Sequence, residues 1–166
     1  LPVEELGKVV ARVVQIEGPV HESEITRRIT SLWGLSRTGR RINDAVRVAI
    51  NWAETNHQVK SEGDFYSHSD QTEFPLRNRE RVDSAGLKKP ELLPPQELQT
   101  GIYKFVTHHV STKSEETARA IGRQLGFRST SRQLREKIEE EIETLISKGK
   151  LVEENGVLRL QRNHRN

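Results

Sequence analysis

The feature that most constrains this chain is an internal repeat, in which the first half matches the second at an offset of 92 residues. The alignment places Trp33-Gly34-Leu35 over Leu125-Gly126-Phe127 and needs no gap in either direction. The other apolar pairs that it brings together include Ile29 with Ile121, Val46 with Ile138, Ile50 with Ile142, and Val59 with Leu151. A self-match of this length predicts that one small structural unit is built twice.

Each half predicts three helices followed by a β-hairpin. First helices are expected over residues 3–16 and 95–109, and third helices over residues 38–56 and 131–148, because apolar residues recur there at helical spacing. Second helices lie between these and end at Gly34 and Gly126, which suit helix C-termini. Hairpins are expected over residues 58–67 and 150–160, and the second contains an Asn-Gly turn. The predicted fold class is therefore mainly α with small β-hairpins (α+β), arranged as two tandem winged helix-turn-helix domains.

The predicted domains are residues 1–68 and 95–162, and residues 69–94 are expected to form a linker laid over the surface of one domain. This segment lacks sustained periodicity and contains three prolines. It also carries a basic run in which Arg77, Arg79 and Arg81 alternate with other residues.

Composition favours an anionic partner only weakly, with a formal net charge of +3 and a pI near 9.3. Cysteine is absent, which excludes disulfides and thiolate metal sites. No stretch has the length of a membrane span or the pattern of a signal peptide, so a cytoplasmic location is expected. Methionine is also absent and the chain starts at Leu1-Pro2, which indicates a piece of a longer protein.

The third helix of a helix-turn-helix domain commonly enters the major groove of DNA with its N-terminal end first. In the first half this region is basic: from Ser36 to His57 there are four arginines against Asp44 and Glu54. Arginine and asparagine read base edges, and arginine and threonine suit phosphates. The candidate contacts in this region are Arg37, Thr38, Arg40, Arg41, Asn43 and Arg47. The alternative is an ordinary solvated helix face.

The second half is a weaker candidate for nucleic acid binding. Its third helix starts similarly, with Arg128 and Arg132, but from Arg128 to Lys148 five basic residues face five acidic ones. Carboxylates along a groove would repel phosphates, so this helix favours protein docking at least equally. Lys60 could approach a nucleic acid backbone from the first hairpin, although both hairpin tips are acidic.

No catalytic motif is found, and the chain is not expected to be an enzyme, to hold a cofactor or to bind a metal. The histidines His21, His108 and His109 lack metal-ligand spacing and are interpreted as surface or capping residues. Trp33 and Trp52 are interpreted as packing residues rather than as platforms for base stacking.

Several short motifs resemble an uncharacterised domain family found at the C-terminus of large bacterial proteins related to superfamily 1 DNA/RNA helicases. They are Gly18-Pro19-Val20-His21, Arg27-Arg28-Ile29, Trp33-Gly34, Arg37-Thr38-Gly39-Arg40-Arg41-Ile42 and, in the second half, Pro94-Pro95-Gln96-Glu97-Leu98 and Leu125-Gly126-Phe127. The resemblance covers roughly residues 9–160 and implies an accessory domain of a nucleic acid-handling machine. It carries no catalytic residue over to this chain.

The leading hypothesis is a nucleic acid-binding accessory module, with DNA preferred to RNA, in which the arginines of the basic linker add affinity. The rival hypothesis is a protein-interaction or dimerisation module of the same larger protein, without nucleic acid contact. Expected partners are DNA or RNA and the remaining domains of the helicase-like parent, with homo-oligomerisation left open and no membrane.

Overall fold

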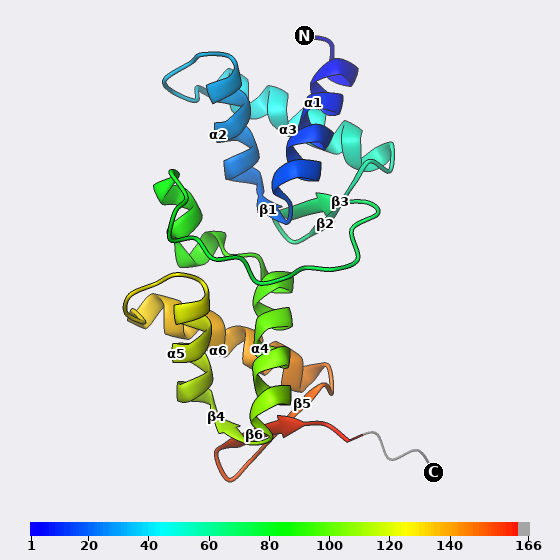
Figure 1. Ribbon diagram of the computed structural model, residues 1–166. Coiled ribbons are helices and arrows are strands. Elements are labelled where there is room, and N and C mark those ends of the chain that lie inside the picture. Colours follow the sequence, from blue (N-terminus) through cyan, green and yellow to red (C-terminus); the bar gives the residue numbers. More distant parts are fainter. Residues whose placement is uncertain (163–166) are drawn as a thin grey trace. The chain divides into compact units, whose positions relative to one another are not determined.

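A computed structural model describes residues 1–162 and divides the chain into two units, Leu1–Glu73 and Phe74–Asn166, called here unit 1 and unit 2. Each unit contains three α-helices and one three-stranded antiparallel sheet (Figure 1). The predicted fold class, mainly α with two winged helix-turn-helix arrangements, is confirmed.

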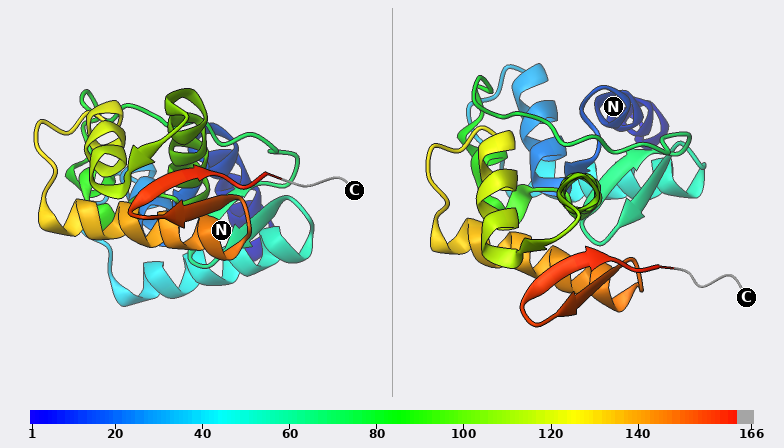
Figure 2. Two further views of the ribbon diagram at one scale, coloured as in Figure 1. Left: turned by 90° about the horizontal axis from the view of Figure 1, so that it is seen from below. Right: turned by 60° about the horizontal axis from the view of Figure 1, so that its bottom comes forward.

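Unit 1 has the element order helix, strand, helix, helix, strand, strand. These elements are α1 (Val3–Glu17), β1 (Val20–His21), α2 (Glu22–Leu32), α3 (Arg40–Thr55), β2 (Val59–Glu62) and β3 (Phe65–His68). The strand order is β1-β3-β2, so the short strand before α2 pairs with the second strand of the hairpin. The hairpin thereby returns against α1, as the further views in Figure 2 also show.

Unit 2 repeats these elements with every boundary shifted by 92 residues. The elements are α4 (Pro95–His109), β4 (Thr112–Lys113), α5 (Ser114–Gln124), α6 (Arg132–Ser147), β5 (Leu151–Glu154) and β6 (Val157–Leu160). The strand order β4-β6-β5 is again that of unit 1. The repeat found in the sequence is therefore a repeat of structure. The strands β1 and β4 were not predicted, because two residues are too few to show a period.

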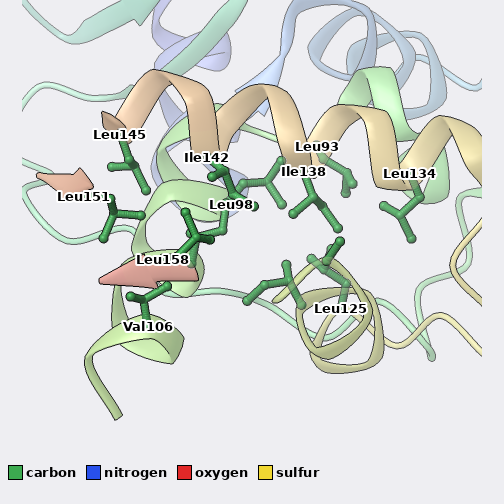
Figure 3. Close-up of a cluster of buried hydrophobic side chains, with 13 residues drawn as sticks. Leu93, Leu98, Val106, Leu125, Leu134, Ile138, Ile142, Leu145, Leu151 and Leu158 are labelled. Atoms are coloured by element: carbon green, nitrogen blue, oxygen red, sulfur yellow. The ribbon is translucent and has the colours of Figure 1, made fainter. Parts of the chain in front are cut away.

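Each unit has its own hydrophobic core. In unit 2, α6 contributes Leu134, Ile138, Ile142 and Leu145, which pack against Leu98 of α4 and the hairpin residues Leu151 and Leu158 (Figure 3). In unit 1 the corresponding residues of α3 are Ile42, Val46, Ile50 and Ala53. Smaller side chains on α3 let it lie closer to α1, where Trp52 packs over Gly7. Burial of each large side chain contributes about 1.5–3 kcal/mol, which is what holds units of this size together.

The segment expected as a linker lies with one domain, because from Phe74 onward it belongs to unit 2. It contains two 3₁₀ turns, η1 (Ala85–Lys88) and η2 (Pro90–Leu92), and Leu93 is fully buried in the core. Leu76 packs against the core at Gly101 of α4. We refer to residues 74–94 as the arm. The arm is part of unit 2, and Leu93 and Leu76 attach it to the core.

Candidate nucleic-acid interface

The third helix of unit 1 is preceded by a loop that is exposed along its length, from Trp33 to Gly39. The hydroxyl oxygen of Thr38 lies 3.0 Å from that of Thr30, and Thr30 is buried in α2, so the end of the loop is fixed to the domain. The helix then starts at Arg40 with Gly39 as N-cap, and no side chain caps its first turn. Its positive end is consequently open to solvent and able to meet an anion.

Four of the predicted contacts lie together at this end of α3. Arg37, Arg40, Arg41 and Asn43 are all exposed, while Val46 and Ala49 face the core. Within residues 1–162, none of the three arginines makes a salt bridge. The arrangement therefore presents three cationic side chains and one amide to solvent from one loop and one helix turn.

Arg47 lies one turn further along and is partly engaged. Its Nε donates to Oε1 of Glu22 on α2 at 3.2 Å, although the Arg47 side chain stays 68% exposed. The ion pair links α2 to α3. Arg47 can still reach a phosphate, but its charge is partly compensated by Glu22.

The hairpin of unit 1 contributes little positive charge. Lys60 donates from Nζ to the backbone oxygen of Gln71 at 2.5 Å. The tip carries Glu62 and Asp64, and the Asp64 backbone oxygen accepts a hydrogen bond from Glu22. Lys60 is therefore occupied within unit 1, and the acidic tip disfavours approach to a phosphate backbone.

The third helix of unit 2 has the same position but a different charge balance. Arg132 pairs with Glu136 at 3.0 Å, and Arg135 faces Glu139 at 3.9 Å. The helix N-terminus is also capped, because the Ser131 hydroxyl accepts from the Leu134 backbone amide. Arg128 is exposed in the preceding loop. Compared with α3, α6 offers neither an open N-terminus nor unpaired arginines in its first turn.

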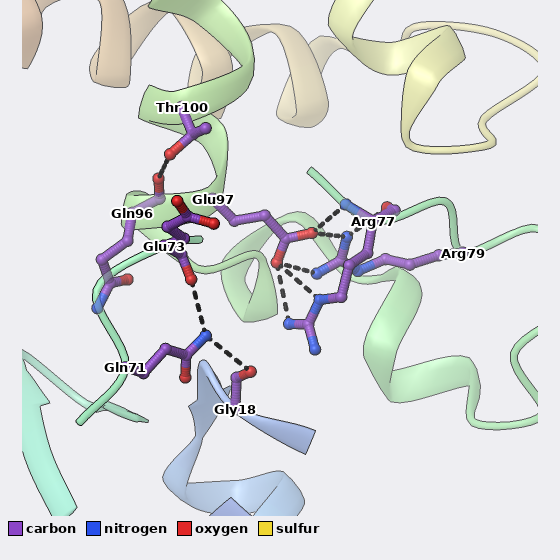
Figure 4. Close-up of polar contacts among 8 residues, drawn as sticks. All are labelled: Gly18, Gln71, Glu73, Arg77, Arg79, Gln96, Glu97 and Thr100. Carbon is purple, nitrogen blue, oxygen red and sulfur yellow. Dashed lines mark hydrogen bonds and ion pairs between the residues drawn. The ribbon is translucent and has the colours of Figure 1, made fainter. Parts of the chain in front are cut away.

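Two of the three arginines predicted in the basic linker are instead bound to Glu97, which is fully buried at the start of α4 (Figure 4). Arg79 donates from Nη1 and Nη2 to the two carboxylate oxygens at 2.7 and 2.8 Å. Arg77 donates from its backbone nitrogen at 2.7 Å and from Nη2 at 2.9 Å. Arg79 is only 5% exposed, so its prediction as a nucleic acid contact is wrong. Arg81 is exposed and stays a candidate.

The electrostatics of this cluster follow from its contacts. Burial alone would raise the pKa of Glu97, but the hydrogen bonds and positive charges of Arg79 and Arg77 together lower it below its ordinary value. Glu97 is therefore a carboxylate that fastens the arm to α4. Sequence reasoning missed it, and the only available signal was its place in the repeat, where its counterpart is Glu5.

Other predicted residues behave in several ways. His21 caps α2, since its Nδ1 accepts from the Ser23 backbone amide, and this confirms its interpretation as a capping residue. Trp52 packs against the core, but Trp33 is 39% exposed, so its interpretation as a packing residue is wrong.

In residues 1–162 no group of three acidic, histidine or cysteine side chains is placed to hold a metal ion. The helices of the same range are all too short or too polar to cross a membrane.

Comparison with known proteins finds a family to which part of unit 1 is similar. Residues 2–44, which run from α1 into the first turns of α3, match the family described as "Protein of unknown function (DUF3320)". No curated protein and no solved structure matches the chain. The matched segment includes the loop with Arg37 and the start of α3, and the family description names no activity.

Proposed function

We propose that this chain is a nucleic acid-binding accessory module that binds DNA through the N-terminal end of α3. The observation that carries the proposal is the exposed group of Arg37, Arg40 and Arg41 beside an uncapped helix N-terminus. Phosphates are bound by arginine side chains and by the open amides of helix N-termini. Asn43 follows on the same helix and supplies an amide able to read an adenine edge.

The helix-turn-helix arrangement explains why these residues can act together. α2 lies against α3, and the Thr30–Thr38 and Glu22–Arg47 contacts fix the two helices on either side of the loop. The arginines therefore extend from a rigid support, which reduces the conformational entropy lost on binding. Arg47 would add a contact at the edge of the interface on unit 1. Arg81 and Arg128 are exposed on unit 2 and would contact nucleic acid from that unit.

The acidic third helix of unit 2 favours a second role, docking to another protein domain. Its exposed face carries Glu136, Glu140 and Glu143, which repel phosphates and attract a basic protein surface. The motif resemblance to helicase-related proteins supplies the context: unit 2 would contact the remaining domains of a larger cytoplasmic protein, while unit 1 engages DNA.

The test measures the affinity of the chain for three fluorescently labelled nucleic acids: a DNA duplex, a single-stranded DNA and a single-stranded RNA. Fluorescence anisotropy reports binding at several salt concentrations. Binding through three arginines gives a slope of log affinity against log salt of about −2.7. Replacement of both Arg40 and Arg41 by Glu is expected to abolish binding. The matched control is Arg132→Glu, because Arg132 is the counterpart of Arg40 in the repeat. This variant should bind with an affinity within about threefold of wild type.

Absence of binding to all three nucleic acids at low salt would exclude the proposal. Equal losses in the Arg40/Arg41 variant and in the Arg132 variant would show that the interface is not the end of α3. Stronger binding of the single-stranded RNA than of either DNA would reassign the substrate class.

A further inference from the structure

The turn after the second helix is covered in unit 2 and uncovered in unit 1. In unit 2, Arg79 of the arm donates its backbone amide to the Leu125 oxygen at 2.7 Å, and Leu125 is fully buried. The Oδ1 atom of Asn78 lies only 2.7 Å from the place where a Cβ atom on Gly126 would stand. In unit 1 the counterparts are Trp33, which is partly exposed, and Gly34, which has nothing within 4 Å of that place.

The uncovered turn gathers apolar surface. Leu32, Trp33 and Leu35 are 59%, 39% and 46% exposed. Their counterparts in unit 2 are a glutamine, the buried Leu125, and Phe127, which packs against the core. Tryptophan in particular is enriched at the energetic centres of protein interfaces. We call Glu5, Leu32, Trp33, Gly34 and Leu35 together the Trp33 face.

The charge that holds the arm in unit 2 also has a counterpart in unit 1. One residue, Arg79, reaches the Leu125 oxygen with its backbone and Glu97 with its side chain. Every element boundary repeats at the same offset, so Glu5 and the Trp33 oxygen occupy the positions on α1 and after α2 that correspond to Glu97 and the Leu125 oxygen. Glu5 is exposed, whereas its neighbour Glu4 pairs with Lys8 at 2.8 Å.

We propose that the Trp33 face binds an extended segment of a partner protein with the pattern small residue, Arg, any residue, Arg. The arm itself shows the chemistry, with Leu76 followed by Arg77 and Arg79. The small residue is required because Val9 stands where α4 has Gly101, against which Leu76 packs. The second arginine would pair with Glu5 and donate its backbone amide to the Trp33 oxygen, while apolar atoms of the segment cover Trp33.

The experiment uses the full chain and a fluorescent peptide with the sequence of residues 74–81, in which alanine replaces the leucine. Binding is followed by peptide anisotropy and by tryptophan emission, because both tryptophans, Trp33 and Trp52, lie in unit 1. A blue shift of the emission is expected on binding. Glu5→Gln should weaken binding at least about tenfold, and the matched control Glu4→Gln should leave it unchanged. A peptide with both central arginines changed to glutamate should not bind.

Three results would overturn the proposal. The first is that the chain does not bind the peptide up to about 1 mM. The second is that the Glu5→Gln variant binds the peptide as tightly as wild type does. The third is that wild type binds the charge-reversed peptide as tightly as the original peptide. Concentration-dependent self-association that Trp33→Ala removes would make a second copy the occupant and would also overturn it. The variant with Arg40 and Arg41 changed to Glu should still bind the peptide, so failure of the nucleic acid proposal stays distinguishable from failure of this one.

Discussion

Replacement of Glu97 by Gln tests whether the arm is fastened to α4 by a buried charge. The substitution keeps the shape of the side chain but removes the negative charge and turns an amide nitrogen toward the donors of Arg77 or Arg79. Since Glu97 is fully buried and Arg79 is nearly so, two guanidinium groups would lose their counter-charge. Loss of one partner of a buried ion pair costs about 3–5 kcal/mol, and a loss of about 3 kcal/mol lowers the Tm of a domain this size by about 12–24 °C.

The measurement is thermal unfolding followed by circular dichroism. The matched control is Glu5→Gln, because the repeat places Glu5 at the same helix position but exposed, and its Tm should stay within about 2 °C of wild type. Tryptophan fluorescence is recorded in parallel, since it reports on unit 1 alone. If Glu97→Gln unfolds at the same temperature as Glu5→Gln, the cluster does not hold the arm and the reasoning fails.

Three further predictions concern pH, backbone conformation and nucleic acid binding. Because the folded-state pKa of Glu97 is lowered, its stabilisation is present above the ordinary value of 4.5 and is lost as the pH falls through the folded-state pKa. The Tm difference between wild type and Glu97→Gln should therefore narrow as the pH falls below the ordinary value of 4.5. A Tm difference that stays constant down to about pH 3 would contradict this. Gly34→Ala should lower the free energy of unfolding by about 1–2 kcal/mol, because Gly34 has a positive φ of 70°. Gly126→Ala also has a positive φ, and Asn78 and Glu80 lie against the new methyl group, so its free energy of unfolding in chemical denaturation should fall clearly more. Between about 50 and 200 mM salt, DNA affinity should fall about 40-fold for wild type, and a salt-independent affinity would exclude phosphate contacts by the α3 arginines.

The repeat and the helices could be predicted from the sequence because both depend on apolar residues at regular spacing. The first helix of unit 2 was placed at its observed bounds, Pro95–His109, and the third helices within two residues at each end. The hairpins followed from their turn residues. The two-residue strands β1 and β4 could not be predicted, because their pairing with β3 and β6 is set by the tertiary fold and not by a local pattern.

The arm could not be predicted because its attachment depends on one buried residue distant in sequence. A run of alternating arginines normally indicates a solvated surface, and the sequence around Glu97 resembles any first helical turn, where acidic residues are common. Only the three-dimensional position of Glu97 shows that two of these arginines are consumed internally. The Trp33 face was missed for the related reason that helical spacing does not reveal whether a neighbouring segment covers a residue.

The two units share a fold but differ in what they leave available for binding. Unit 2 pairs the arginines of its third helix with glutamates on the same helix, and its own arm covers the turn at Leu125. Unit 1 leaves both equivalent surfaces open, one carrying Arg40 and the other carrying Trp33. Substitutions of the exposed charged side chains on these two surfaces, such as Arg40 and Glu5, should therefore change binding and leave unfolding nearly unaffected, whereas substitutions at Glu97 or Gly126 should change unfolding first. Because the repeat supplies a counterpart for each of these residues, every such comparison can be made between two positions of the same chain.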